Sequence, residues 1–250
     1  MKKKVIALVL CGIMALSVPV YAKGGSVSLS KDELQMPKNN DSNADSGKKE
    51  KKKSKNKDVI TVTQSGWTIM TNSSSGDRYV AYGAKVTNSS SDKYGYVTLN
   101  IVVKDANGKI LKTSEDTFSS IAAGDTVFAA DKLHIGQYDP ASVEFSVSYE
   151  DSDILDALSN DYSTDDFTLS NLSEMTDEYG FVKLTGEITS EASEDCSSVC
   201  VTVLLEQGES IVGGFYGYAD VTSGETTAFE ITDYDLPEHD NVEISARSTW

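Results

Sequence analysis

Apolar and polar residues alternate along most of the chain after residue 59, in short runs separated by turn residues. The run YVTLNIVVKD, residues 96–105, places Leu99, Ile101 and Val103 on one face. This period of two predicts a β-strand with one buried face. Asn107-Gly108 follows, and both central residues of a type I′ turn take positive φ, so we expect a type I′ hairpin.

The same pattern occurs twice in the chain. Residues 84–103 align without a gap on residues 186–205, so that Val86 falls on Ile188. Beyond a hairpin that is two residues shorter, Gly108 falls on Gly208 and Gly124 on Gly224, and VEFSVS (143–148) matches VEISAR (242–247). The chain is therefore a tandem repeat of one β-domain of about 90 residues.

Each repeat carries five to seven short strand patterns, which fits an immunoglobulin-like β-sandwich. We expect an all-β protein in which a signal peptide and a disordered linker precede two tandem immunoglobulin-like β-sandwich domains. The expected boundaries are 59–149 for repeat 1, 150–164 for an acidic linker and 165–250 for repeat 2.

The first 22 residues predict a cleaved signal peptide. Three lysines precede an apolar stretch at 5–18, and Val20-Tyr21-Ala22 supplies the small residues of a cleavage site after Ala22. Lipid anchoring at Cys11 is disfavoured, because Leu10 stands where a lipobox has Gly, Ala or Ser; an uncleaved anchor is the other alternative. No later stretch has the length of a transmembrane helix, so we expect a secreted or cell-surface associated protein without a transmembrane segment in the mature chain.

Charge is distributed unevenly along the chain. Residues 23–58 form a Lys-rich segment with ten Lys against six acidic residues, which predicts a disordered linker that acts as a solvated spacer or contacts an anionic membrane or cell-wall polymer. Residues 150–250 carry two basic residues against 24 acidic ones, a net charge of −22. A surface this acidic repels phosphate, so nucleic acid is excluded as a partner.

A resemblance to a known family follows from the strand that ends in VTNSSS, the hairpin VTLNIVVKDANGKIL and the later SSIAAGDT. These segments resemble the FxLYD-type domains of secreted proteins and lipoproteins from Gram-positive bacteria. The segments FAADKL (128–133) and FEITDYDL (229–236) approximate the motif that gives the family its name. The resemblance implies immunoglobulin-like domains and supplies no catalytic residues.

Enzymatic motifs are absent from the sequence. The two histidines, His134 and His239, lie in no recognisable nucleophile motif, so we expect no catalytic residues. An enzyme built on a carboxylate pair stays as an alternative, and it would need an enclosed cleft between the domains, lined by two acids from different strands.

Cys196 and Cys200 are the two cysteines that follow the expected signal peptide. Exported chains form disulfides, but a bond across four residues of extended strand would need a turn or bulge at residues 197–198. A disulfide between them and two free thiols therefore both remain open. A zinc site is disfavoured, because no second Cys pair or nearby His completes four ligands.

Two further residue groups suggest binding. Acidic clusters at 151–166 and at Asp233, Asp235 and Asp240 could supply oxygen ligands to calcium, and otherwise they are solvated surface. In FYGYAD (215–220), Phe215 and the pair Tyr216 and Tyr218 face opposite sides of a strand. Exposed tyrosines can stack on sugars or pack on a protein, and otherwise these tyrosines pack at an edge or in the core.

We therefore expect a non-enzymatic exported bacterial protein that acts as a cell-surface interaction or spacer module. Its partner would be a protein or a cell-wall polymer, and no cofactor is expected. The alternative is a calcium-dependent binding module, with carbohydrate as a possible ligand, that uses the acidic clusters of the second half.

Overall fold

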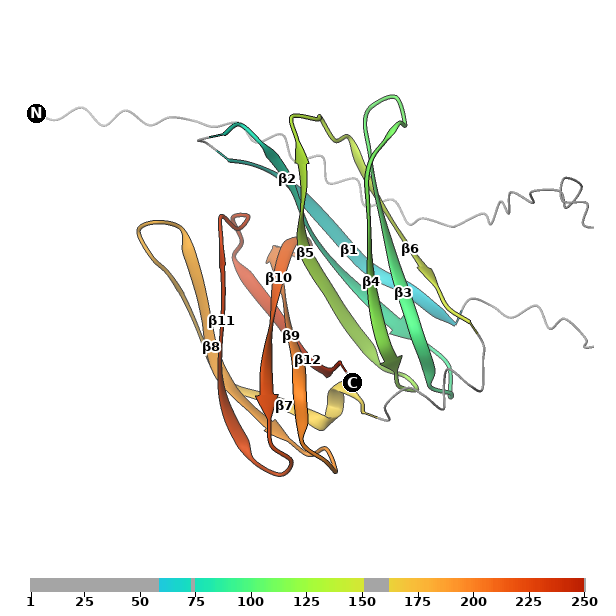
Figure 1. Cartoon of the computed structure of the whole chain (residues 1–250), viewed down its shortest axis with the longest axis vertical. Helices are drawn as coiled ribbons and strands as arrows, with labels where there is room; N and C mark the ends of the chain where they lie inside the picture. Colours follow the sequence, from blue (N-terminus) through green and yellow to red (C-terminus); the bar gives the residue numbers. More distant parts are fainter. Residues whose placement is uncertain (1–58, 73–74, 151–161, 250) are drawn as a thin grey trace, which may run out of the picture. The chain divides into compact units, whose positions relative to one another are not determined.

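The computed structural model describes residues 59–72, 75–150 and 162–249 (Figure 1). The signal peptide with Cys11 and Ala22, the Lys-rich linker, residues 151–161 of the acidic linker and Trp250 lie outside the described residues. The described chain is all-β: it has twelve strands and one short 3-10 helix, Thr164–Asp166, and no α-helix. The predicted fold class is thus confirmed at the level of an all-β protein.

The first six strands form two antiparallel three-stranded sheets, with the orders β1-β2-β5 and β4-β3-β6. We call this pair of sheets the first sandwich. Its strands are β1 (Ile60–Thr71), β2 (Arg78–Asn88), β3 (Tyr94–Lys104), β4 (Ile110–Ile121), β5 (Thr126–Gly136) and β6 (Ser142–Ser148).

The last six strands repeat this arrangement, with the sheet orders β11-β8-β7 and β10-β9-β12. We call this pair the second sandwich; it takes the yellow to red colours in Figure 1. Its strands are β7 (Phe167–Thr176), β8 (Phe181–Ser190), β9 (Cys196–Gln207), β10 (Ser210–Val221), β11 (Thr226–Tyr234) and β12 (Asn241–Ser248).

Each sandwich has a separate apolar core between its two sheets. Leu99, Ile101 and Val103 of β3 are fully buried in the first core, and Val201 and Val203 of β9 occupy equivalent positions in the second. Val86 and Ile188, which the internal alignment pairs, are fully buried on β2 and β8. The residues that match between the halves therefore lie on equivalent strands and face equivalent cores.

The β3–β4 hairpin differs from the predicted type I′ turn. Only Gly108 takes positive φ, at 78°, and Asn107 does not. The Asp105 carboxylate accepts hydrogen bonds from the backbone N–H groups of Asn107 and Lys109, at 2.8 and 2.9 Å. Because this side chain holds the turn, one left-handed glycine closes the hairpin with a bulge beside Lys104.

A β-bulge interrupts the regular pairing of β1 with β2. The register with β2 shifts between Val62 and Gln64, which breaks the alternation of the strand. Ile60 is buried and Trp67 packs against the core, whereas Ile69 is exposed. No helix within the described residues is long and apolar enough to cross a membrane.

Candidate functional site

The two sandwiches contact each other through the outer faces of two sheets, β1-β2-β5 of the first and β10-β9-β12 of the second. Phe128 and Ala130 of β5 form a third buried apolar cluster with Leu204 of β9 and Ile211 of β10. We call this contact the junction. At this cluster β5 and β9 are buried on both faces, because their alternate side chains face the two cores.

Glycines allow the backbones at the junction to approach closely. A Cβ at Gly66 of β1 would lie 1.8 Å from the carbonyl oxygen of Ile211, and one at Gly214 of β10 would lie 2.7 Å from the Cβ of Ala130. Neither separation is possible for real atoms, so a side chain at either position would push the sheets apart.

An ion pair joins the sandwiches at one end of the junction. The Lys132 ammonium lies 2.5 Å from the Asp233 carboxylate and donates a hydrogen bond of 2.5 Å to the Tyr234 carbonyl. It also lies 4.2 Å from the centre of the Tyr234 ring. The Lys132 and Asp233 side chains are only 14% and 19% exposed, so water screens this pair weakly.

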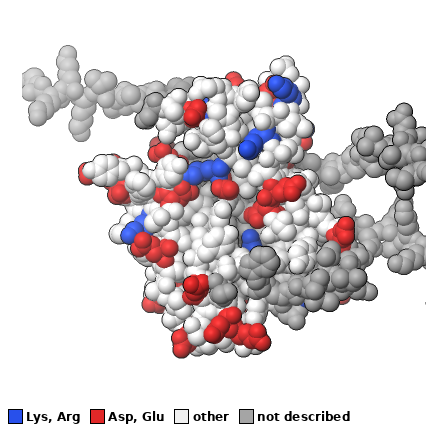
Figure 2. Space-filling view, viewed as in Figure 1, with Lys and Arg blue, Asp and Glu red and all other residues white. Residues whose placement is uncertain are grey.

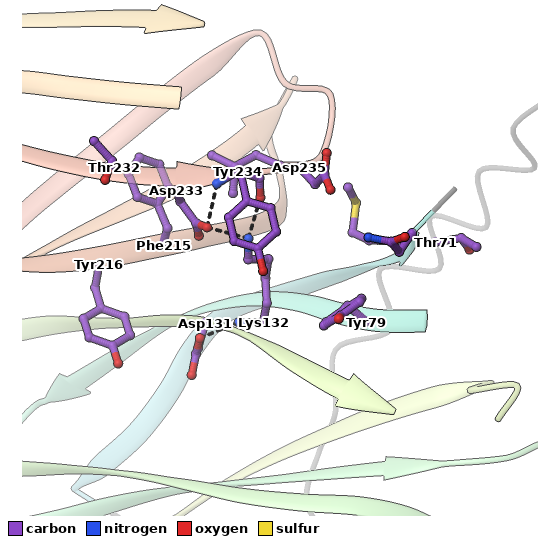
Figure 3. Close-up of a pocket in the computed structure, with 13 residues that line it drawn as sticks. Thr71, Tyr79, Asp131, Lys132, Phe215, Tyr216, Thr232, Asp233, Tyr234 and Asp235 are labelled. Atoms are coloured by element: carbon purple, nitrogen blue, oxygen red, sulfur yellow. Dashed lines mark hydrogen bonds and ion pairs between the residues drawn. The ribbon is translucent and has the colours of Figure 1, made fainter. Parts of the chain in front are cut away.

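A pocket of about 470 Å³ opens at this end of the junction (Figure 3). Both sandwiches contribute to its walls, which combine aromatic rings with carboxylates. The lining residues are Met70, Thr71, Asn72, Tyr79, Asp131, Lys132, Phe215, Tyr216, Thr232, Asp233, Tyr234, Asp235 and Leu236. We call it the junction pocket.

Asp131 lies on β5 beside Lys132, and Figure 3 shows its carboxylate directed away from Asp233, near Tyr216. Adjacent residues of a strand point to opposite faces, which separates the Asp131 and Lys132 side chains. The carboxylate accepts one hydrogen bond of 2.6 Å, from the backbone N–H of Lys132. Burial raises the pKa of Asp131, the Lys132 N–H opposes the shift, and the charges of Asp116 and Asp233 raise the pKa further.

Tyr216 and Tyr218 of β10 extend the pocket as an aromatic surface. Their rings are 5.7 Å apart in an edge-to-face arrangement, and the residues are 42% and 59% exposed. Phe215 of β10 is buried in the second core, on the face of the strand opposite the two tyrosines, as the sequence predicts. Burial raises the pKa of both tyrosines, and the charge of Asp131 adds to the shift at each.

A second charged contact joins the sandwiches at the same junction. Arg247 of β12 lies 3.8 Å from the Asp116 carboxylate and 4.9 Å from the centre of the Phe118 ring, both on β4. Burial raises the pKa of Asp116, and the Arg247 charge acts against that shift. The Nε atom of Arg247 is buried without a hydrogen-bond partner among the described residues.

The three aspartates predicted as calcium ligands serve other roles. Asp233 pairs with Lys132, Asp235 takes a positive φ of 49° before β12, and Asp240 accepts hydrogen bonds from the Gly208 N–H. Within the described residues, no three His, Cys, Asp or Glu side chains come together in a group that could hold a metal ion. The described residues therefore supply no set of ligands for the calcium-dependent binding module that the sequence offered as an alternative.

The sequence left a disulfide and two free thiols open; in this structure Cys196 and Cys200 are both free, buried thiols. Cys196 packs in the second core, whereas the Cys200 sulfur lies 3.6 Å from the Thr202 hydroxyl oxygen. Burial raises the pKa of both thiols. Regular alternation would place Cys196 and Cys200 on the same face, but the register of β9 with β10 shifts between Cys196 and Val199, so Cys196 shares the core face with Val199 and Val201 and Cys200 lies on the other face.

The histidines lie beside carboxylates rather than nucleophiles. His134 Nε2 is 3.6 Å from Asp77, and His239 Nε2 is 3.2 Å from Glu174. The junction pocket does have acids from different strands, Asp131 and Asp233, as a carboxylate-pair enzyme would require. However, the Lys132 ammonium pairs with Asp233, and the Asp131 carboxylate points away from it, so the two do not flank a common point (Figure 3).

Sequence reasoning identified Tyr216, Tyr218, Asp233 and Asp235, but it missed Asp116, Asp131, Lys132 and Arg247. For two of these residues, Asp116 and Asp131, the sequence contained a signal in the alternation of their strands. Asp116 and Asp131 lie two residues from Phe118 and Leu133 on their strands, so they occupy positions that alternation assigns to the core. A carboxylate at such a position indicates a partner or a site.

No protein-family model and no curated protein matches this chain. Among solved structures, the chain matches the N-terminal CBM22-1-CBM22-2 tandem domain of Xyn10C from Paenibacillus barcinonensis, at 9% identity and a TM-score of 0.16. The match covers 76% of this chain and 85% of the other. With so low a TM-score, the likeness shows neither a shared ligand nor a shared overall fold.

Proposed function

We propose that this chain is a non-enzymatic binding module, exported to the cell surface, that holds its partner at the junction pocket. One observation carries the proposal: a pocket of about 470 Å³ whose walls come from both sandwiches and combine tyrosine rings with carboxylates. Pockets that combine apolar walls with a few polar groups are the usual places for ligands.

Export and domain type belong to the same proposal. The lysine-led apolar segment at residues 1–22 supports export, and the Lys-rich segment that follows supports a role as a spacer at the surface. The repeated strand order and the segments that resemble FxLYD-type domains support two immunoglobulin-like domains of that family. The partner would be a protein or a polymer of the cell envelope.

The acidic surface favours a partner that carries positive charge. Figure 2 shows one face of the molecule, on which Asp and Glu side chains are spread with few Lys or Arg between them. Electrostatic attraction speeds the encounter with an oppositely charged partner, while close contacts in a pocket determine specificity.

Filling the junction pocket tests this proposal. The Thr232→Trp variant places an indole in the pocket, and the Thr168→Trp variant makes the same change at an exposed position of β7 outside it. Both variants of the full chain are compared with the unmodified chain by co-sedimentation with purified cell envelopes. We expect Thr232→Trp to abolish the binding and Thr168→Trp to retain it; equal binding by all three proteins would refute a site at the junction pocket.

A further inference from the structure

Three cations at the junction share one arrangement. Each lies over an aromatic ring, pairs with a carboxylate and connects the two sandwiches. The sets are Lys85 with Phe128 and Glu243, Lys132 with Tyr234 and Asp233, and Arg247 with Phe118 and Asp116. A cation held between a ring face and a carboxylate is stabilised by both when water is partly excluded.

The distances between the cations and the ring centres lie in the range of cation–π contacts. The ring centres lie 5.5 Å from Lys85, 4.2 Å from Lys132 and 4.9 Å from Arg247. In each set the cation and its carboxylate come from different sandwiches, as in the pair of Lys132 on β5 with Asp233 on β11. The junction therefore uses this arrangement repeatedly to join its two halves.

A fourth carboxylate and ring set lacks its cation. Asp131 of the first sandwich and Tyr216 of the second both line the junction pocket, and Figure 3 shows their polar ends on the same side. Among the described residues, no ion pair joins Asp131 to a cation, and Tyr218 adds a second exposed ring. Asp131 and Tyr216 thus provide the same two components as the other three sets, a carboxylate and an aromatic ring, without the cation.

We propose that a basic side chain of a partner polypeptide, Arg or Lys, docks between Asp131 and the Tyr216–Tyr218 pair. This inference rests on the proposed function and names the chemistry of the ligand. The side chain's methylene stem would lie along the exposed rings while its charged end meets the carboxylate. Asp116 adds negative potential at this place, because its charge raises the pKa of Asp131.

The same observations disfavour the other ligand classes. A divalent metal ion needs several oxygen ligands, and the described residues hold no group of three acidic, His or Cys side chains for one. An anionic polymer would meet the repulsion of Asp131, Asp233 and Asp235 against the single Lys132. A cation, by contrast, relieves the mutual repulsion of these carboxylates.

A pair of peptides that differ in charge alone tests the inference. The full chain is titrated by calorimetry with acetyl-Gly-Arg-Gly-amide and with the same peptide that carries citrulline, the neutral isostere of arginine. We expect the arginine peptide to bind and the citrulline peptide to bind at least about tenfold more weakly. Equal affinity for the two peptides would overturn the inference.

Matched variants then locate the site. Asp131→Asn and Glu225→Gln each remove one negative charge, but Glu225 is exposed and lies outside the pocket. We expect Asp131→Asn to weaken the arginine peptide about tenfold, with Glu225→Gln close to the unmodified chain. Tyr216→Phe retains a ring and keeps the affinity, whereas Tyr216→Ala lowers it several-fold. Equal losses for Asp131→Asn and Glu225→Gln would mean that the acidic surface attracts the peptide without a site.

This experiment can fail while the proposed function holds. If Thr232→Trp abolishes binding to cell envelopes but the arginine peptide does not bind, the pocket is the site and its ligand is not a basic side chain. If the peptide binds through Asp131 while Thr232→Trp leaves binding to envelopes intact, the cation site is real and the proposed function is wrong.

Discussion

At the scale of single residues, the junction depends on carboxylates that burial makes costly to ionise. Asp116 and Asp131 both have pKa values raised by desolvation, and each lies at a position of its strand that alternation assigns to the core. Such groups are retained where they hold a cation, since a buried charge without a partner destabilises the folded state.

Asp131→Asn should stabilise the folded protein at neutral pH. The folded-state pKa of Asp131 is raised, so the folded state binds more protons than the unfolded state between the unfolded-state pKa of about 3.8 and the raised value. Ionisation therefore removes stability as pH rises through that window. Urea unfolding at pH 7 should show a larger free energy of unfolding for the variant, and the difference should vanish below pH 3.8. A variant that is less stable at pH 7 would contradict this account.

The Arg247 and Asp116 pair should behave as a coupled unit. Arg247→Met leaves the Asp116 carboxylate without its cation and should lower the free energy of unfolding by about 2 kcal/mol. The double variant Arg247→Met with Asp116→Asn should recover most of that loss, because it removes the unpaired charge as well. Additive losses in this double-mutant cycle would show that the two groups do not interact.

At the scale of elements, the sequence predicted the strands well because their cores are regular. Leu99, Ile101 and Val103 alternate strictly and lie fully buried. Two local features depart from regular alternation: a bulge after Val62 shifts the register of β1, and the Asp105 side chain holds the β3–β4 turn, which is not the predicted type I′ turn. Both depend on hydrogen bonds that residue alternation does not encode.

The junction was not predicted, although the sequence carries a signal for it. VFAA in β5 and VLL in β9 are continuous apolar runs within otherwise alternating strands. Such runs are typical of strands buried on both faces. The identity of the second covering surface requires the structure.

Gly66→Ala should open the junction. The new Cβ would meet the Ile211 carbonyl oxygen, so the facing strands must separate or β1 must move. Overpacking of this kind costs about 1–3 kcal/mol of unfolding free energy. Ser65→Ala, on the same strand, is the control, and urea unfolding measures both. Equal stabilities would show that the two sheets do not touch at Gly66.

At the scale of the whole molecule, the shared junction should couple the unfolding of the two sandwiches. The buried cluster of Phe128, Ala130, Leu204 and Ile211 belongs to both, so unfolding one sandwich exposes apolar surface of the other. Calorimetry of the full chain should therefore give one transition, and Gly66→Ala should separate it into two. Two transitions in the unmodified chain would indicate sandwiches that unfold independently.

The function could be predicted from the sequence only as a class. Alternation, internal repetition and charge indicate an all-β, acidic chain, and strand parity placed Tyr216 and Tyr218 on the face opposite Phe215. The pocket could not be predicted, because Asp131 and Tyr216 are 85 residues apart and meet only when one sandwich packs on the other.

Hydrogen exchange of the full chain, with and without purified cell envelopes, tests the central claim most directly. A partner in the junction pocket should slow amide exchange in β5, β10 and β11, whose residues line it, and leave the hairpin at Gly108 unchanged. Slower exchange at that hairpin, with β5, β10 and β11 unaffected, would place the binding surface elsewhere and contradict the account.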